Sequence, residues 1–163
     1  MTITAWRITQ ARYVEGDDAA AGRAAFGGEG ARLYGGRWNS RGTPVAYAAA
    51  SRSLALLEVL VHLGAPQLLA RYVLIPVIFA PQHVEDLADG PDDWRAHPAP
   101  RSTQEIGDAW VREARTPVLQ VPSVVVPAEW NVVVNPRHPD FDALEIGPPE
   151  ALDVDARLRA GDG

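Results

Sequence analysis

Residues 30–47, GARLYGGRWNSRGTPVAY, combine residue types that suit binding of an anion. Arg32, Arg37 and Arg41 stand among four glycines, directly before an apolar run. Arginine presents a planar fork of N–H donors that fits phosphate or carboxylate, and glycine lets a backbone approach a ligand closely. The stretch therefore predicts a site for an anionic ligand. A solvent-exposed loop with incidental charge is the alternative that the stretch alone leaves open.

The known nucleotide motifs do not fit this stretch. A G-x-G-x-x-G pattern beginning at Gly28 would need glycine at position 33, where Leu33 stands. The sequence contains no lysine, so a P-loop and Schiff-base chemistry are both excluded. If the stretch binds phosphate, it must do so through arginine and backbone amides.

Glu58 is an acid inside an apolar segment, SRSLALLEVLVHL, where every neighbour within three positions is apolar. A carboxylate buried there without partners would be costly, so Glu58 must be paired or face a cavity. One interpretation is a functional carboxylate on a core helix. The other is an exposed pair with His62, one helical turn further on.

Ser123 and the histidines carry weaker signals. Ser123 lies between Pro122 and an apolar run, which also suits a strand-edge serine that bonds its own backbone. No G-x-S-x-G elbow surrounds it, so hydrolase chemistry of that kind is not indicated. The four histidines show no metal-ligand spacing, and we expect no metal site. Trp38, beside Arg37, is a candidate for framing a pocket.

The order of the expected strands and helices along the chain predicts an α+β fold. Its β core is split, with mixed or antiparallel strands, and helices flank it. We expect the Gly/Arg stretch and residues 81–101 to be loops, the latter a plain surface loop or a docking or lid segment. The helix near residue 102 has a capping-box pattern, Ser102-Thr-Gln-Glu105. Strands are predicted at residues 3–9, 44–48, 71–79, 118–126 and 130–134, and helices at residues 19–26 (capped by Asp18), from Ser51 or Ser53 to 62, from 102 to about 116, and in the tail.

Composition narrows the function classes. A length of 163 residues fits a single domain, with a core at about 3–147 and a C-terminal tail at about 148–163. The net charge of −6 argues against a general nucleic-acid binder. With no cysteine, no visible signal peptide and no membrane-length apolar run, we expect a cytoplasmic protein without a membrane partner.

Three blocks together resemble the RES-domain toxins, a family named for an arginine, a glutamate and a serine. The blocks are GARLYGGRWNSRGTPVAYAAAS, LALLEVLVHL and VLQVPSVVVPAEWNVVVNPRHPDF, in family order. The resemblance implies a fold similar to ADP-ribosylating toxins, with NAD+ held in a cleft. It places the catalytic positions on Arg37, Tyr47, Glu58 and Ser123. It implies NAD+ binding by Arg7, Arg37, Trp38, Asn39, Tyr47, Ser123 and Asn131.

The resemblance also implies a function. We expect the toxin of a toxin–antitoxin pair, which cleaves the nicotinamide–ribose bond of NAD+ by hydrolysis or phosphorolysis and arrests growth. Its expected partner is an Xre-type helix-turn-helix antitoxin, with a possible homodimer inside the complex. One alternative is a mono-ADP-ribosyltransferase that modifies a protein. An alternative of another class is a non-catalytic module that binds a nucleotide or the antitoxin.

Overall fold

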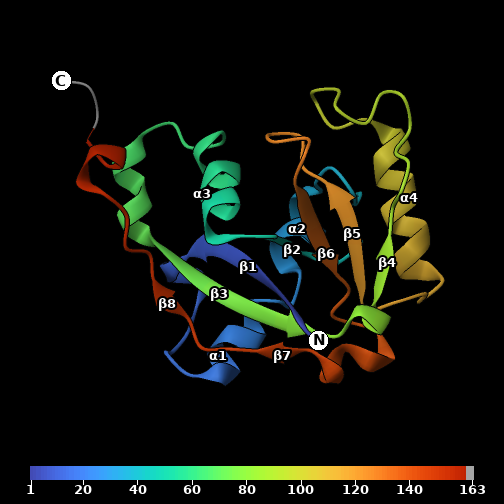
Figure 1. Ribbon diagram of the computed structural model, residues 1–163, viewed down its shortest axis with the longest axis horizontal. Coiled ribbons are helices and arrows are strands. Elements are labelled where there is room, and N and C mark those ends of the chain that lie inside the picture. The colour runs from blue at the N-terminus through green and yellow to red at the C-terminus, as the bar shows by residue number, and fades with distance from the viewer. Residues whose placement is uncertain (161–163) are drawn as a thin grey trace.

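The computed structural model describes residues 1–160, which form a strongly curled mixed sheet with helices packed around it (Figure 1). The strand order is β4-β5-β6-β2-β1-β3-β7, and β8 pairs with β3 beyond this path. The strands are β1 (Ile3–Gln10), β2 (Ala46–Ala49), β3 (Tyr72–Phe79), β4 (Val84–Asp86), β5 (Val118–Pro122), β6 (Trp130–Val134), β7 (Glu145–Ile146) and β8 (Glu150–Ala151).

The sheet has two halves joined at a narrow seam. Strands β4, β5, β6 and β2 form one half, in which only the β4–β5 pair is parallel. Strands β1, β3, β7 and β8 form the other half, with eight registered pairs between β1 and β3. The halves meet at β1 and β2, where Trp6 pairs with Ala49. The expected α+β class with a mixed, mostly antiparallel sheet is confirmed.

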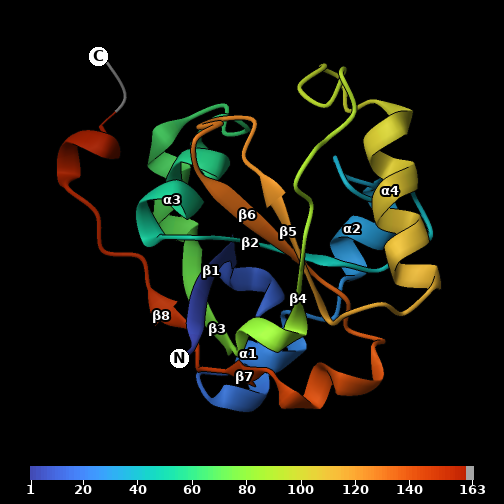
Figure 2. The same ribbon diagram turned by 45° about the vertical axis from the view of Figure 1, so that its right-hand side comes forward.

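Four α-helices flank the sheet, and they lie on different sides of it (Figure 2). Helix α3 packs against β1 and β2, and α1 lies near β7. Helix α4 stands beside β4 and β5 at the opposite end of the molecule. The helices are α1 (Ala19–Ala24), α2 (Glu29–Tyr34), α3 (Arg52–Leu60) and α4 (Arg101–Arg112). Short 3-10 helices lie at Ala11–Tyr13, Pro66–Arg71, Pro81–His83, Pro139–Ala143 and Ala156–Leu158.

Three groups of buried side chains form the core of residues 1–160. The largest centres on Phe26 and the inner faces of both sheet halves. A second lies under α4 and contains Trp38 and Trp110. A third lies under α3 and contains Leu54 and Leu74. The site described below lies where these groups meet.

The beginnings of the helices confirm two caps and overturn one. The side chains of Asp18 and Ser51 accept hydrogen bonds from backbone amides three residues later, as expected for N-caps. The predicted capping box before α4 is wrong. The helix begins at Arg101 after Pro100, while Ser102 donates to Asp93.

Several predicted boundaries also differ. The Gly/Arg stretch contains helix α2, enclosed by Gly28 and Gly35, whose φ angles of 78° and 73° favour glycine. Residues 81–101 include the short strand β4. Strand β5 ends at Pro122 rather than at residue 126. The tail contains the short strand β8 and, in line with the expected short helix, a 3-10 helix; residues 161–163 lie outside the described part.

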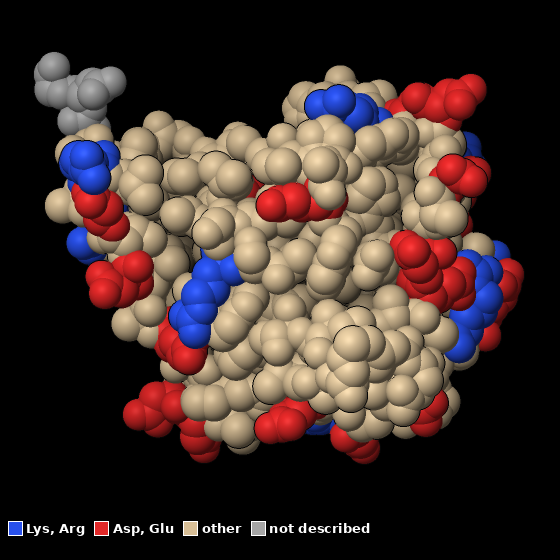
Figure 3. All heavy atoms as spheres, viewed as in Figure 1, with Lys and Arg blue, Asp and Glu red and all other residues tan. Residues whose placement is uncertain are grey.

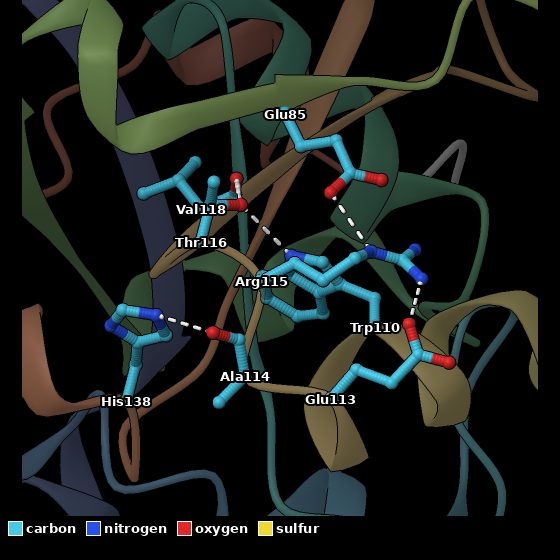
Figure 4. Close-up of polar contacts among 8 residues, drawn as sticks. All are labelled: Glu85, Trp110, Glu113, Ala114, Arg115, Thr116, Val118 and His138. Carbon is cyan, nitrogen blue, oxygen red and sulfur yellow. Dashed lines mark hydrogen bonds and ion pairs between the residues drawn. The ribbon is translucent and has the colours of Figure 1, made fainter.

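The turn after α4 ties this helix to β5 and to the segment after β6 (Figure 4). The Trp110 indole N–H donates to Thr116, whose hydroxyl donates to the Val118 carbonyl. His138 Nδ1 accepts from the Asp140 amide, so Nε2 carries the proton and donates to the Ala114 carbonyl at 3.0 Å. These bonds hold the C-terminal end of α4 against the sheet.

Charged side chains lie mainly around the margins of the face in Figure 3, and the centre of that face is largely uncharged. Within residues 1–160, no helix is long and apolar enough to cross a membrane.

Candidate functional site

A cavity of about 790 Å³ lies between the two sheet halves and is covered by α3 on one side and by the residues before α4 on another. This volume suits a sizeable small-molecule ligand. Arginine and glutamate side chains on its wall come from separate elements: Arg7 from β1, Arg37 from the loop after α2, and Glu58 from α3. Other lining residues include Trp6, Tyr34, Tyr47, Ala55, His62, His97, Gln104, Val121 and Asn131.

Glu58 is held at one of its two carboxylate oxygens. Its Oε1 accepts from Ser123 Oγ at 2.6 Å and from Asn131 Nδ2 at 2.8 Å. Helix α3 places it there because Leu54 and Ala55, on the helix side that faces the core, are buried against the sheet. Among the residues that the structure describes, Oε2 has no hydrogen-bond donor. The carboxylate is thus oriented by two neutral donors and has a free oxygen in a residue that lines the cavity.

The contacts of Glu58 distinguish a functional carboxylate from an exposed pair with His62. The partners of Glu58 lie at the end of β5 and in β6, and the contacts of the carboxylate are not those of an exposed pair with His62. His62 itself lines the cavity. Asn131 also lines it, and its Oδ1 is a buried acceptor with no partner in the described part of the chain.

Ser123 lies behind the cavity wall, where it touches Glu58. The side chain is 0 % exposed, and its Oγ also accepts from the Val126 amide at 3.0 Å. The strand-edge interpretation is therefore correct in part, since the hydroxyl does bond a nearby backbone group. Ser123 does not line the cavity, and its hydroxyl proton is donated to Glu58, so the expected direct contact of Ser123 with a ligand is not favoured.

Arg37 is fixed through one end of its guanidinium. Nη1 donates to the carbonyls of Trp94 and Ala96, both at 2.8 Å. These two bonds use both protons of Nη1 and leave Nε and Nη2 without an acceptor in the described residues. Partial burial lowers the pKa of Arg37, and the negative charge of Glu58 opposes this shift. The guanidinium stays charged at neutral pH.

Tyr47 presents its ring to the cavity and its hydroxyl to the loop behind. The hydroxyl donates to Asn39 Oδ1 at 2.6 Å and accepts from the Trp38 amide at 3.1 Å. Burial raises the pKa of the Tyr47 phenol well above its usual range. Stacking of the ring on a ligand stays a prediction.

Asn39 and Trp38 differ from the direct ligand contacts expected of them. Asn39 is 0 % exposed, and its Nδ2 donates to the carbonyls of Ala31 and Thr43. It therefore orders the loop and holds Tyr47. Trp38 is 2 % exposed and packs in the core beside Trp110, so only a small part of it reaches the cavity wall.

Arg7 lies deeper than Arg37 and is tied to the backbone. Its Nε donates to the Ala25 carbonyl at 2.9 Å and its Nη1 to the Tyr47 carbonyl at 3.2 Å. Its guanidinium carbon lies 5.9 Å from the centre of the Phe26 ring. Burial lowers the pKa of Arg7 to about 10. The structure thus brings together Arg7, Arg37, Tyr47, Glu58 and Asn131 on one cavity, with Ser123 and Asn39 behind them.

Sequence reasoning missed the groups that hold Arg37. The carbonyls of residues 94–96 and the first turn of α4 carry no side-chain motif, so only the topology reveals them. The proline-rich character of residues 81–101 was the one available signal that this segment has a role at the cavity. It does reach the site, since His97, Pro98 and Ala99 line the wall.

Comparisons with known proteins place the chain in a family. A family model described as "RES domain" matches residues 4–155. The chain is 40% identical over 157 residues to "Toxin Res" of Photorhabdus laumondii, a match that covers 94% of this chain and 95% of that protein. It is 41% identical over 151 residues to the "Prs ADP-ribosylating toxin" of Sphingobium sp., with 89% of each chain covered.

One solved structure supports the fold. The M. tuberculosis MbcT–MbcA toxin–antitoxin complex contains a chain that superposes with a TM-score of 0.70 at 22% identity, covering 99% of this chain and 91% of that one. The family match spans nearly the whole chain and includes every element that lines the cavity. On these grounds, the chain belongs to the RES domain family.

Proposed function

We propose that this protein is the toxin of a toxin–antitoxin pair and cleaves the nicotinamide–ribose bond of NAD+, with water or phosphate as the acceptor. The observation that carries the proposal is the oriented Glu58 carboxylate on the same cavity as Arg37. The names of the RES relatives support the toxin role.

The chemistry requires a negative charge beside the ribose. Departure of neutral nicotinamide leaves positive charge on the sugar, and the transition state resembles an oxocarbenium ion. A fixed carboxylate in a partly buried cavity stabilises that charge without reorganising during the reaction. Glu58 meets this need because Ser123 and Asn131 hold one oxygen and leave the other free.

Binding of the dinucleotide requires cations that can grip its pyrophosphate. Arg37 retains Nε and Nη2 as a pair of donors, and such a pair matches two oxygens of one phosphate. Arg7 retains Nη2 and supplies a second positive charge deeper in the same cavity. We therefore assign the pyrophosphate to Arg37 and the carboxylate side of the cavity to the nicotinamide ribose.

The test is release of nicotinamide from NAD+ by the purified protein. Glu58→Gln keeps an oxygen that can accept from Ser123 and Asn131 but removes the charge. We expect it to lower kcat about 100-fold or more, as with loss of an electrostatic catalytic group. Glu105→Gln, an exposed acid paired with Arg101 on α4, is the matched control and should behave as wild type. A fully active Glu58→Gln protein contradicts the proposal.

A second candidate is transfer of ADP-ribose to a protein, and one relative favours it. The Sphingobium protein, 41% identical, carries the name "Prs ADP-ribosylating toxin". Incubation of a cell extract with NAD+ labelled in its adenylate part separates the two reactions. Label that stays on a protein band supports transfer, whereas free ADP-ribose or its 1″-phosphate supports degradation.

An antitoxin partner is part of the proposal. The structural neighbour was solved as a toxin–antitoxin complex, which supports a partner of this kind here. From the family resemblance we expect an Xre-type antitoxin and a homodimer core. Co-purification with the product of an adjacent gene, followed by light scattering, measures both.

A further inference from the structure

One face of helix α4 contacts Gly36, Arg37 and Ser40 in the loop that carries Arg37. Gln104 Nε2 donates to the Gly36 carbonyl at 3.0 Å, and Thr103 Oγ1 donates to the Arg37 carbonyl at 2.6 Å. One turn later, Asp108 accepts from the amide of Ser40 at 3.0 Å and from its hydroxyl. Since residues four apart share a helix face, Gln104 and Asp108 lie on one side of α4, which acts as a rigid support for the loop.

Close packing strengthens this support. A Cβ added at Gly107 would lie only 1.6 Å from the Trp38 carbonyl oxygen, so the loop backbone rests directly on the helix. The loop cannot shift toward α4, and the hydrogen bonds on either side of Gly107 keep it from moving away.

Thr103 lies at the centre of this contact. Its side chain is 0 % exposed, and its hydroxyl is within reach of two carbonyls, Arg37 at 2.6 Å and Pro100 at 3.0 Å. A hydroxyl has one proton, and the shorter distance assigns it to Arg37. Residues 94–96, just before α4, hold the other end of Arg37 at its guanidinium. The start of α4 thus restrains the backbone of Arg37, and the segment before the helix restrains its side chain.

We propose that Thr103 is a positioning residue for Arg37, which orients the free Nε and Nη2 donors toward the phosphate of the substrate. The proposal rests on the function proposed above for its kinetic consequence. Its structural consequence, the fixed orientation of Arg37, does not depend on which reaction the site performs.

The variants separate the hydroxyl from the packing. Thr103→Val keeps the shape and removes the hydrogen bond, while Thr103→Ser keeps the hydroxyl and removes a methyl group. Thr116→Val is the matched control, since Thr116 has a similar hydroxyl contact at the other end of α4, away from the cavity. Four quantities are measured for each variant: KM and kcat for NAD+, the NMR signal of Arg37 Nε–H, and the midpoint of denaturant unfolding.

We expect Thr103→Val to raise KM about tenfold and to broaden or shift the Arg37 Nε–H signal, because a misplaced donor pair loses a charge-assisted bond. Thr103→Ser should have a KM within about twofold of the wild-type value, a difference of a few tenths of a kcal/mol. Its Arg37 Nε–H signal should match that of wild type. Thr116→Val should lower stability and leave KM and the Arg37 signal unchanged.

Each outcome decides the proposal. If Thr103→Val matches wild type in KM and in the Arg37 signal, or changes them no more than Thr116→Val does, the proposal is overturned. If Thr103→Val does not fold, Thr103→Ala is compared with Thr103→Ser by the same criteria. If the wild-type protein releases no nicotinamide, the proposed function fails, and the Arg37 Nε–H signal alone decides the role of Thr103.

Discussion

Glu58 carries the negative charge at this site, and two neighbouring side chains orient it. Its carboxylate is half-buried, and two neutral donors, Ser123 and Asn131, hold the same oxygen. A cation bound at that oxygen would neutralise the charge that a developing ribose cation needs. Neutral donors orient the carboxylate and leave its charge in place. We propose that the serine of the family motif acts through the glutamate, to which its hydroxyl donates.

Removal of the Ser123 hydroxyl tests whether this group orients the Glu58 carboxylate. Ser123→Ala leaves Asn131 as the one remaining donor to Glu58 Oε1 within the described residues, so the carboxylate becomes less ordered. We expect kcat for nicotinamide release to fall about tenfold with KM nearly unchanged, because the lost order affects the transition state more than substrate binding. Unfolding should become easier by about 1 kcal/mol, since the Val126 amide also loses its acceptor. A larger effect on KM than on kcat contradicts this role.

Tyr47 gives a prediction on alkaline pH. Burial raises the pKa of its phenol above the ordinary value of 10, so the folded protein keeps this proton where the unfolded chain loses it. The folded state then binds more protons than the unfolded state, and the free energy of unfolding falls as pH rises above about 10. Below that pH the contribution is fully present.

The measurement for Tyr47 is a difference against Tyr47→Phe. Arg7, whose pKa is lowered to about 10, acts in the opposite direction, and subtraction of the variant removes that common effect. We expect the stability gap between wild type and Tyr47→Phe to shrink between about pH 9 and pH 11, following an ordinary tyrosine pKa in the unfolded chain. Tyr47 in the folded protein should not show tyrosinate absorbance in this range. A gap that stays constant through this range contradicts the assignment.

Among the secondary-structure elements, those whose ends or pairing depend on nearby residues could be predicted from the sequence. Asp18 and Ser51 were recognised as caps because a cap needs only its own first turn. Strand β6 is predicted because WNVVV is rich in β-branched residues, and the structure places it centrally in its half of the sheet. Arg37, Tyr47 and Glu58, the sequence candidates for catalysis, line one cavity.

The elements that sequence missed depend on contacts with distant residues. Strand β4 has three residues and forms a parallel pair with β5, about 30 residues away. The capping-box pattern at Ser102 failed because the helix already begins at Arg101, which places Ser102 inside the first turn, where its hydroxyl donates to Asp93. Whether Ser123 faces the cavity or lies behind Glu58 depends on how β5 ends against α3, and no local spacing encodes that.

The contact between α4 and the Arg37 loop leads to a prediction on Gly107. A methyl group there would overlap the Trp38 carbonyl, which belongs to backbone that is packed in the core. We expect Gly107→Ala to destabilise the fold by about 2 kcal/mol or more and to raise KM for NAD+ as the loop is displaced. Gly30→Ala in α2 is the control, since nothing lies within 4 Å of an added Cβ, and it should be neutral or slightly stabilising. Equal stabilities of the two variants, measured by urea unfolding, would show that the loop does not rest on α4 as described.

For the whole molecule, the cavity lies across the seam between the two sheet halves. The seam has one registered pair, Trp6 with Ala49, whereas the cavity wall takes Arg7 from one half and Asn131 from the other. A ligand in the cavity therefore contacts both halves and adds contacts where the sheet has few. The core group around Phe26 also includes buried residues from both halves, so we expect them to unfold together.

ADP-ribose, which retains the pyrophosphate and has no nicotinamide bond to break, tests this coupling. At about 100 times its Kd it should stabilise the fold by about 2.7 kcal/mol, which raises Tm by about 5–10 °C in a domain of this size. The melt should remain a single transition, because the ligand adds contacts to both halves together. Arg37→Ala should need a much higher ADP-ribose concentration for the same shift, since it lacks the Nε and Nη2 donors assigned to the pyrophosphate. If calorimetry shows two separate transitions and ADP-ribose shifts only one of them, the cavity belongs to one half of the sheet alone. If ADP-ribose shifts the Tm of Arg37→Ala as much as that of wild type, the pyrophosphate binds elsewhere.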